Sequence, residues 1–478
     1  MQKRIGQLKR LQIRAASLFL AMMFFPGACV SQVPPLKSRS EVVTGLRATA
    51  IPLKNKANDY DVLMTLVGDA RLVLLGEATH GTHEFYQERA RITQRLIQEK
   101  GFTAIVVEGD WPDAYRVNQY VQGQGGDASA EQALSNFVRF PRWMWRNAEV
   151  RDLVQWLRQH NLALPATRQR VAFHGMDVYS LPRSLESVVQ HLEKVDPQIA
   201  RRARERYRCF ERFGNDPEAY GLATLRQSSG SCAGAATEQL QELQQLYQQA
   251  RQPRTGLSNG GVDGTSPAQP KRADELFAAL QNARIIKNAE QYYRVMYEGT
   301  TSSWNLRDQH MADTVEALAT HLGAPNRPAK IVVWAHNSHV GDARSTAMGE
   351  SGEWTLGQLM RQRIKDQAVL VGFTTYQGEV MAASAWGEAG KVERVRPALP
   401  GSFAALFHET GIGNFLLPLR GESQLVLAMG EPRLERAIGV VYLPQTERES
   451  HYFQARMSRQ FDAVIHLDTT SAVKPLQP

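Results

Sequence analysis

The chain of 478 residues lacks the sequence signatures of several large enzyme classes. It contains neither the Walker loop of P-loop NTPases nor the His-Glu-x-x-His motif of zinc proteases. The Gly-x-Ser-x-Gly elbow of serine hydrolases should lie between a strand and a helix, and no predicted strand ends in it. No internal repeat is found. The sequence therefore does not place the chain among P-loop NTPases, His-Glu-x-x-His zinc proteases or serine hydrolases of the elbow type.

The chain also has little net positive charge beyond its first residues. The formal net charge is +8, and five of these charges belong to Lys3, Arg4, Lys9, Arg10 and Arg14. The remaining sequence is close to neutral, so no nucleic-acid partner is expected. A hydrophobic fraction of 43% and a charged fraction of 22% are ordinary for a globular protein, and the length allows one large core or two smaller ones.

The apolar run Ala15–Ala28 is shorter than the roughly 20 residues that a membrane-spanning helix needs. Basic residues followed by such a short run are typical of a secretory signal peptide, which we predict at residues 1–28. Residues 29–66 are interpreted as an N-terminal tether, including the stretch "VPPLKSRS", and a lead-in to the core.

Cysteine is rare, with three in the chain, and the first one concerns export. Cys29 follows a Pro-Gly-Ala tripeptide, and small residues before a cysteine resemble a bacterial lipoprotein cleavage site, so Cys29 is a candidate for lipidation. The alternative is plain cleavage close to residues 31–32. The sequence thus predicts an exported protein, periplasmic or lipid-anchored to the cell envelope, with membrane contact only through that anchor.

The other two cysteines, Cys209 and Cys232, form an even pair. In an exported chain such a pair indicates a disulfide. A chain-entropy argument gives it a stabilisation of about 3 kcal/mol for a loop of roughly two dozen residues. The alternative is two independent thiols, one of them packed in the core.

Apolar runs of strand length recur along the chain, and helical patterns lie between them. Several runs lack polar alternation, which indicates strands covered on both faces. This order of elements predicts an α/β fold, a layered sheet of largely parallel strands flanked by helices. The runs are Arg71–Gly76, Thr103–Glu108, Arg170–Gly175, Lys330–Ala335, Ala368–Phe373, Ile438–Leu443 and Ala463–Leu467.

The core is interrupted by a long segment without a convincing strand. We predict the first part of the α/β core at 67–180, a helical insertion at 181–300 and the second part of the core at 301–478. Within the insertion, residues 253–270 are rich in Gly, Ser and Pro and predict a mobile loop. The insertion is a possible lid over a binding site.

Histidines and acids follow the ends of four predicted strands. In layered α/β folds, chemistry collects beyond the carboxyl ends of the strands, so these side chains are expected to converge. Each alone has a plainer interpretation as a capping acid or a polar loop residue. The groups are Glu77 and His80 in "LLGEATHGTHE", Glu108 and Asp110 in "VVEGDWPDA", His174 and Asp177 in "FHGMDVYS", and His336 and His339 in "VWAHNSHVGD".

An imidazole beside a carboxylate indicates general-base chemistry. Glu77 would hold the tautomer of His80 and raise its basicity, so that His80 takes a proton from water. An arginine would stabilise the oxyanion of a tetrahedral intermediate. This combination predicts hydrolysis of an ester or lactone without a covalent intermediate.

Two arginines are candidates from their positions in predicted helices. Arg89 lies on the buried side of the helix that follows His80, where it needs a carboxylate partner such as Glu77 or Glu108. Arg307 opens another helix, and Asp308 beside it is interpretable as a first-turn acid.

The motifs together resemble those of the erythromycin esterase family, from about Val67 to the end of the chain. The motifs that carry the resemblance are "LLGEATHGTHEFYQERARI", "VVEGDWPDA", "RDQHMADTV", "VVWAHNSHVGDAR" and "SHYFQARMSRQFDAVIHLD". The resemblance implies an α/β core with a helical part and hydrolysis of the macrolactone of 14-membered macrolides, an antibiotic-resistance activity. It also implies a catalytic set of His80 as general base with Glu77, Glu108, Arg89, Arg307, His336 and His339.

Four tryptophans are considered as the lining of an apolar substrate pocket, although tryptophan is more often a core residue. Trp111 and Trp304 are the predicted substrate-binding residues, and Trp143 and Trp145 are the other two candidates. The expected partner is a small-molecule ester or lactone.

Two other functions stay open. No cofactor is expected, but a divalent metal is not excluded, because His80, His336 and His339 with Glu77 or Glu108 offer enough ligands for a metal-dependent hydrolase. The chain could also be a non-enzymatic envelope lipoprotein that binds a bulky apolar ligand.

Overall fold

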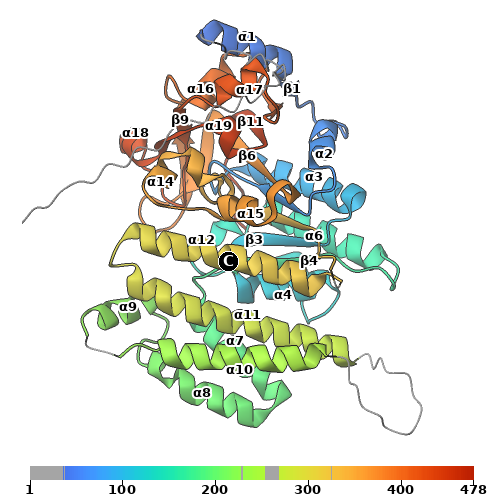
Figure 1. Ribbon diagram of the computed structural model, residues 1–478, viewed down its shortest axis with the longest axis vertical. Coiled ribbons are helices and arrows are strands. Elements are labelled where there is room, and N and C mark those ends of the chain that lie inside the picture. The colour runs from blue at the N-terminus through green and yellow to red at the C-terminus, as the bar shows by residue number, and fades with distance from the viewer. Residues whose placement is uncertain (1–35, 37, 228–229, 253–267, 325, 478) are drawn as a thin grey trace, which may run out of the picture.

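The computed structural model describes residues 36, 38–227, 230–252, 268–324 and 326–477 (Figure 1). The predicted signal peptide, Cys29 and residues 253–267 of the predicted mobile loop lie outside the described residues. The last three residues of that loop, 268–270, belong to a helix instead. None of the helices in the described part of the chain is both long and apolar enough to span a bilayer.

One mixed sheet forms the centre of the molecule. Its strands are β1 (Ile51–Pro52), β2 (Leu72–Leu75), β3 (Ala104–Asp110), β4 (Ala172–Asp177), β5 (Ile331–Trp334), β6 (Ala368–Ala382), β7 (Lys391–Val395), β8 (Phe415–Pro418) and β11 (Ala463–Thr470). Within the described residues the spatial order is β1-β8-β11-β6-β2-β5-β3-β4, with β7 paired to β6. The five contacts from β11 to β4 are parallel, whereas β1, β7 and β8 pair antiparallel. The predicted layered, largely parallel sheet is confirmed.

Helices cover both faces of this sheet. In the first part of the chain they are α1 (Arg39–Thr49), α2 (Asp61–Val67), α3 (His83–Lys100), α4 (Trp111–Val121), α5 (Ala130–Leu134) and α6 (Ala148–Ala163). Helix α3 ends at Lys100 because Gly101 takes a left-handed φ of 70°, which glycine adopts without strain. Side chains of α3 and α6 pack with alternate residues of the strands, such as Val73 and Val107, in one apolar layer.

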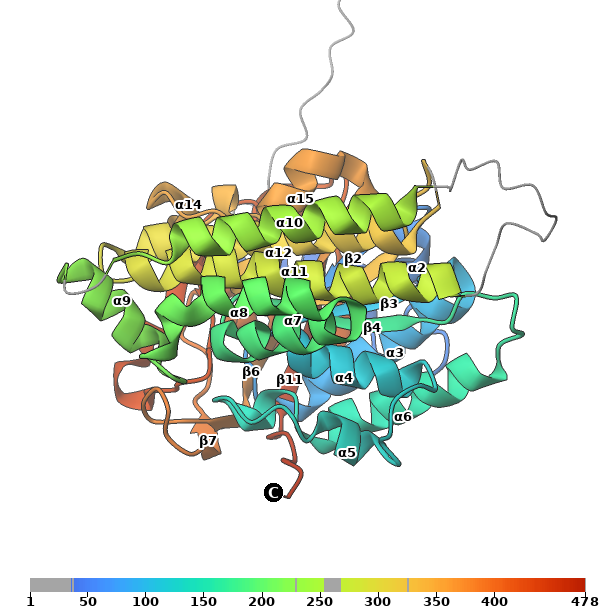
Figure 2. The ribbon, with the colours of Figure 1, turned by 90° about the horizontal axis from the view of Figure 1, so that it is seen from below.

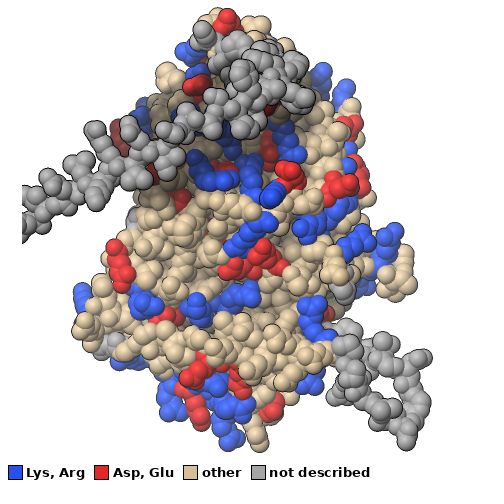
Figure 3. Space-filling model, viewed as in Figure 1, with Lys and Arg blue, Asp and Glu red and all other residues tan. Residues whose placement is uncertain are grey.

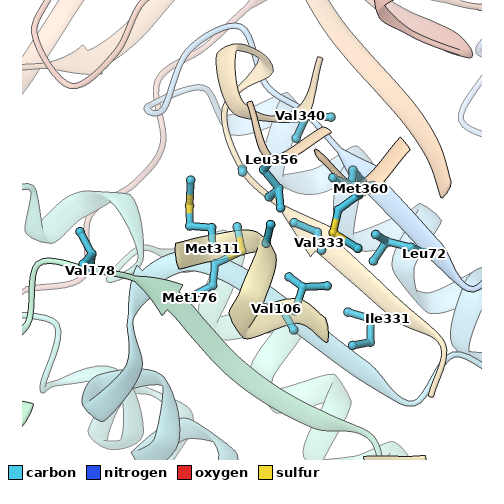
Figure 4. Close-up of a cluster of buried hydrophobic side chains, with 14 of the residues drawn as sticks. Leu72, Val106, Met176, Val178, Met311, Ile331, Val333, Val340, Leu356 and Met360 are labelled. Carbon is cyan, nitrogen blue, oxygen red and sulfur yellow. The ribbon is translucent and has the colours of Figure 1, made fainter. Parts of the chain in front are cut away.

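The second apolar layer lies on the opposite face. Met311 of α12 (Thr300–Leu322) and Met360 of α15 (Leu356–Ile364) pack against the strand residues that point the other way, among them Val106 and Val333 (Figure 4). Because parallel strands with both faces covered must be apolar on both sides, the near-continuous apolar runs of the sequence are explained.

The helical insertion extends the second layer. It comprises α7 (Leu181–Val195), α8 (Pro197–Glu211), α9 (Pro217–Leu225), α10 (Ala233–Arg251) and α11 (Ala268–Val295). These helices stack below α12, away from the sheet, and α10, α11 and α12 run side by side (Figures 1 and 2). A disulfide joins Cys209 of α8 to Cys232, which precedes α10, with the two Cα atoms 6.0 Å apart.

Short elements complete the C-terminal part. They are α13 (Asn337–Val340), α14 (Ala347–Glu350), α16 (Phe403–His408), α17 (Gln424–Met429), α18 (Glu447–Ser450), α19 (Met457–Gln460) and the hairpin of β9 (Arg433–Arg436) with β10 (Tyr452–Ala455). Lysine and arginine alternate with aspartate and glutamate on the face shown in Figure 3, so that face has no broad patch of one sign.

One expectation about local structure is wrong. The predicted strand Ile438–Leu443 forms only isolated bridges, at Ile438 and Val441. Ile438 and Tyr442 are buried in a small separate cluster, and the two bridges join the segment to Thr79 and Ala383, which lie beyond the ends of β2 and β6. The predicted tether is partly ordered, since Ser38 caps α1 through a capping box and α1 buries Val42, Val43 and Leu46.

Candidate active site

A cavity of about 450 Å³ lies beyond the carboxyl ends of β2, β5, β3 and β4. These four strands are neighbours in the sheet, so the residues that follow them meet at one edge. Polar groups form its floor: His80, Glu108, Asp110, Asp113, Arg139, Asp177, Arg307, His336 and His339. The structure thus brings residues together that lie more than 250 positions apart in the sequence.

The loop after β2 holds a three-membered charge relay. His80 Nδ1 lies 2.9 Å from Glu77 Oε1, and Arg89 Nη2 donates to Glu77 Oε2 at 2.7 Å. Glu77 and Arg89 are fully buried, whereas His80 reaches the cavity. An ionised carboxylate only accepts hydrogen bonds, so Nδ1 carries the proton and Nε2 keeps its lone pair. The ring is therefore set up as a base.

The backbone of this loop is fixed almost residue by residue. Asn337 N donates to Glu77 O, Ile438 N to Ala78 O, and the Tyr86 hydroxyl to His80 O, each at 2.8 Å. Glycine is required before and after the relay because other segments approach closely. A Cβ on Gly76 would lie 2.1 Å from Asn337 Oδ1, and one on Gly81 would lie 1.9 Å from Met381 O.

Arg307, on the second turn of α12, is the centre of the deeper part of the site. Its Nε and Nη2 donate to both oxygens of Asp177 at 2.9 and 2.7 Å, and Nη2 also donates to Glu108 Oε1 at 2.7 Å. Its Nη1 donates to His339 Nε2 at 2.8 Å. A guanidinium has five N–H groups, so these four bonds leave one Nη1–H for the cavity that Arg307 lines.

The contact with Arg307 also determines the tautomer of His339. Because a guanidinium cannot accept a hydrogen bond, His339 Nε2 must be the acceptor, and the ring proton lies on Nδ1. Nδ1 faces Asp308 Oδ2 at 2.8 Å, and Trp304 stacks on the ring with centroids 4.4 Å apart. His339 is thereby held in place by three groups, and both of its ring nitrogens are used in contacts that orient Arg307.

His336 faces His80 across the floor, with ring centroids 4.9 Å apart. Its backbone N–H donates to Glu108 Oε2 at 2.8 Å, and its Nδ1 accepts from the Ser338 backbone N–H at 3.2 Å. The ring proton is then on Nε2, where it is available to an oxygen of a bound molecule. Burial, reinforced by the nearby His80, lowers the pKa of His336 to about 3, which keeps the ring neutral.

The surroundings shift His80 and Glu108 in opposite directions. Burial alone would lower the pKa of His80, but its hydrogen bond to Glu77 and the charges of Glu108 and Glu77 outweigh burial and raise it. Burial would raise the pKa of Glu108, but Arg307, His80 and the backbone N–H of His336 outweigh burial and hold it well below the ordinary value. Glu108 therefore stays ionised and favours the protonated form of His80 next to it.

The side chains of the site are bonded to one another rather than arranged as the ligands of a metal ion. In the described part of the chain, no group of three or more His, Cys, Asp or Glu side chains has a geometry that could hold a metal ion. His80 and His339 each use one ring nitrogen on a carboxylate, and the Arg307 guanidinium lies between Glu108, Asp177 and His339. These residues do not converge on a single point as the ligands of a zinc ion would.

The walls of the cavity are aromatic and apolar. They consist of Phe137, Phe140, Pro141, Met144, Trp145, Tyr179, Trp304, Met348, Trp386, Val440 and Phe453. Trp386, in the loop between β6 and β7, is 59% exposed and touches Phe140 edge-on, with ring centroids 5.1 Å apart. A polar floor under an aromatic wall fits a bulky, mostly apolar molecule with one polar reacting group.

Of the two predicted substrate-binding tryptophans, Trp304 lines the cavity and Trp111 does not. Trp111 is 1% exposed and stacks on His174 in the apolar layer beneath the insertion, with centroids 4.9 Å apart. The prediction for Trp111 is wrong because, as the first residue of α4, it points away from the cavity that Asp110 and Asp113 line. His174 shares that buried position.

The roles of three residues of the site are not indicated by the sequence. Asp177 is recognisable from the sequence as a strand-end acid but is not in the predicted catalytic set, although it accepts two hydrogen bonds from Arg307. Asp308 is interpretable from the sequence as a first-turn acid, and only the fold shows that it holds His339. Tyr179, over which both Arg139 and Arg307 lie at 4.9 Å, had no sequence signal.

Comparison with known proteins connects this geometry to a family. The family model described as erythromycin esterase matches residues 97–470. Erythromycin esterase type II of Escherichia coli is 23% identical over 68% of this chain and 74% of its own length, and type I is 22% identical over 66% and 73%. The putative hydrolase YbfO of Bacillus subtilis is 20% identical over 88% and 89%.

Solved structures agree with this comparison at the level of the fold. A succinoglycan biosynthesis protein has a TM-score of 0.71 at 20% identity, covering 92% of this chain and 99% of that one. A Bacillus cereus protein scores 0.71 at 21% identity (92% and 100%), and a mutant erythromycin esterase EreC in its open conformation scores 0.59 at 16% (87% and 94%). The resemblance drawn from the motifs is confirmed. Glu77, His80 and Arg89 precede the range of the family model, so their roles rest on the motif and the geometry.

Proposed function

Because this chain belongs to the erythromycin esterase family, we propose that it hydrolyses a carboxylic ester or lactone by direct attack of water, with His80 as the general base. The observation that carries the proposal is the relay in which Glu77 accepts from His80 Nδ1 at 2.9 Å. This contact leaves Nε2 of His80 unprotonated beside the cavity. It gives one defined position at which a water molecule can lose its proton.

The reaction follows from the placement of the other groups. Water donates a proton to His80 Nε2, and its oxygen attacks the carbonyl carbon of the substrate. The negative charge that develops on the carbonyl oxygen is stabilised by the remaining Nη1–H of Arg307 and by the Nε2–H of His336. Glu77 and Glu108 stabilise the His80 imidazolium, which is the role of a buried carboxylate in a catalytic pair.

Breakdown of the tetrahedral intermediate completes the cycle. The bond to the alkoxide oxygen breaks, and His80 returns its proton to that oxygen, which leaves as an alcohol. The other product is a carboxylic acid, and in a lactone the two products stay in one opened chain. His80 is neutral again and no covalent enzyme intermediate forms, consistent with the lack of a serine or cysteine nucleophile motif in the sequence.

The substrate class that fits the aromatic wall is a bulky apolar ester or lactone. The names of the E. coli relatives suggest the macrolactone of 14-membered macrolides as one such substrate. We further propose that the protein acts after export, in the periplasm or anchored to the envelope through Cys29, so that it would meet its substrate before the substrate reaches the cytoplasm.

The test is a screen of the purified mature protein against macrolides, other lactones and simple esters, with mass spectrometry to detect the addition of one water. His80→Ala should abolish the reaction. His83→Ala is the matched control, because His83, the first residue of α3, forms a similar pair with Glu149 of α6 at 2.6 Å but does not line the cavity. Full activity in His80→Ala would reject the mechanism, and activity lost on chelation and restored by a metal would favour a metal-dependent one.

A further inference from the structure

The segment 471–477, which follows β11, lies across the loop that carries His80. Ser471 O accepts from His83 N, and Val473 N donates to Gly81 O, each at 2.9 Å. Ala472 thereby forms an antiparallel bridge with Thr82. The segment thus makes a two-bond main-chain pairing with the residues immediately after His80.

A side chain strengthens the same attachment. The Ser471 backbone N–H donates to Glu84 Oε2 at 2.8 Å, and its hydroxyl donates to Glu84 Oε1 at 2.7 Å. Glu84 is in the first turn of α3, so this contact ties the segment to the helix that also carries Arg89. Hydrogen bonds to an ionised carboxylate are stronger than neutral ones.

The segment also bonds to the wall of the cavity. Ala148 N donates to Lys474 O at 2.9 Å, and Leu476 N donates to Arg146 O at 3.0 Å. Arg146 and Ala148 come one and three residues after Trp145, which lines the cavity together with Met144. The segment therefore connects the loop that holds the base to the wall that faces the substrate.

Burial holds the segment in place between these two attachments. Val473 is 2% exposed and packs into the apolar layer formed by α3 and α6, and Ala472 and Leu476 pack against its border. A loosely associated tail would not bury its middle residue in the core. The attachment is thus part of the folded state.

The pairing matters because it acts on Gly81, the residue directly after His80. Its carbonyl oxygen accepts from Met381 N at 3.0 Å and from Val473 N at 2.9 Å. The first bond comes from β6 and the second from the segment, and together they fix the Gly81–Thr82 peptide, one residue beyond His80. A shift of that peptide would turn the imidazole away from Glu77, to which it is bonded through Nδ1.

We propose that residues 471–477 act as a strap that positions His80 against Glu77 and couples this pair to the Met144–Trp145 wall, an inference that rests on the proposed function of His80. Val473, Ser471 and Glu84 are positioning residues, because they act on His80 through the backbone of its loop. The strap contributes nothing directly to substrate contact.

The experiment compares two substitutions of one residue in the full chain. Val473→Pro removes the N–H that bonds to Gly81 O, whereas Val473→Ala trims the side chain and keeps that N–H. Val473→Pro is expected to lower kcat by about 10- to 100-fold with KM within a factor of two, since displacement of a catalytic group by about 1 Å can cost 100-fold. Val473→Ala should keep kcat within about threefold of the wild type. Glu84→Ala, which leaves the apolar contacts intact, should lower kcat in the same direction if Val473→Pro fails to fold.

A second readout separates the strap from the proposed reaction. Histidine NMR, with the His80 signal assigned by its loss in His80→Ala, reports the Nδ1–H bonded to Glu77. Exchange of the His83 amide reports the pairing itself. We expect faster amide exchange and a His80 pKa that moves toward the ordinary value in Val473→Pro and not in Val473→Ala. Equal effects of the two substitutions on kcat and on both spectra would overturn the strap. Altered spectra together with an active His80→Ala enzyme would retain the strap and reject His80 as the base.

Discussion

Replacing Glu77 by glutamine tests the tautomer on which the mechanism depends. Arg89 Nη2 donates to Glu77 Oε2 at 2.7 Å, and a guanidinium has no lone pair to accept a bond. In Glu77→Gln the amide oxygen must therefore face Arg89, which places the amide N–H₂ against His80 Nδ1. His80 then accepts at Nδ1 and carries its proton on Nε2, where it cannot take a proton from water.

The structure allows both consequences of Glu77→Gln to be sized. The same exchange of tautomers in a serine protease triad lowers kcat by about 10,000-fold, and we expect a loss of this order here. The free energy of unfolding should also fall, by about 3–5 kcal/mol, because the buried Arg89 loses its counter-charge. The aromatic rings of Tyr86 and Trp334 lie under the guanidinium, with their centroids 4.4 and 4.6 Å from its carbon atom. They compensate for only part of that loss.

A double variant distinguishes the two effects. Glu77→Gln combined with Arg89→Met removes the unpaired charge, so urea unfolding should return toward the wild-type free energy. Hydrolysis should recover only in part, because the amide oxygen can then turn to His80 Nδ1 but carries no charge to stabilise the imidazolium. Histidine NMR should show the His80 proton on Nε2 in Glu77→Gln. Hydrolysis within tenfold of the wild type in a folded Glu77→Gln enzyme would refute the tautomer argument, and with it the assignment of His80 as the base.

Four further predictions use other parts of the structure. Because the raised pKa of His80 lies above about 6.5, the fraction of neutral base grows as pH rises, so kcat/KM should fall with decreasing pH through that pKa and level off above it. Arg307→Lys keeps the charge but not the fork, and kcat should drop about 100- to 1000-fold with a smaller change in KM, measured in steady-state assays. Trp386→Ala should raise KM about 2- to 10-fold and leave kcat unchanged, as expected for an aromatic contact with an apolar substrate. Cys209→Ser with Cys232→Ser should lower the free energy of unfolding by about 3 kcal/mol in urea titrations without altering hydrolysis.

The position of the site was predictable from the sequence for a simple physical reason. Apolar runs without alternation identify strands buried on both faces, and such strands are parallel and share one carboxyl edge. Glu77, Glu108 and His336 each follow such a run within two residues. Their convergence at one edge of the sheet therefore needed only the assumption that their strands are neighbours, and β2, β5 and β3 are adjacent in the sheet.

The details that failed depend on direction and on distant partners. Trp111 lies one residue after Asp110, and a helix beginning at that point sends the two side chains to opposite sides, which no local pattern reveals. The run Ile438–Leu443 has the composition of a strand, but its neighbours are Thr79, in the loop after β2, and Ala383, just beyond the end of β6, so it forms bridges instead of a ladder. Asp308 obtained its role from His339, 31 residues away.

The contacts of α12 limit how the helical insertion can move. Arg307 of α12 bonds at once to Asp177, Glu108 and His339, at the ends of three different strands, and these charge-assisted bonds tolerate displacements of only a few tenths of an ångström. Motion of the insertion together with α12 as one body would pull Arg307 away from the site and leave Glu108 and Asp177 buried without a counter-ion. A lid movement that preserves the site must therefore occur between α12 and the helices α7–α11. If α12 instead moved with them, opening of the insertion would disable Arg307 and hydrolysis would be confined to the closed form.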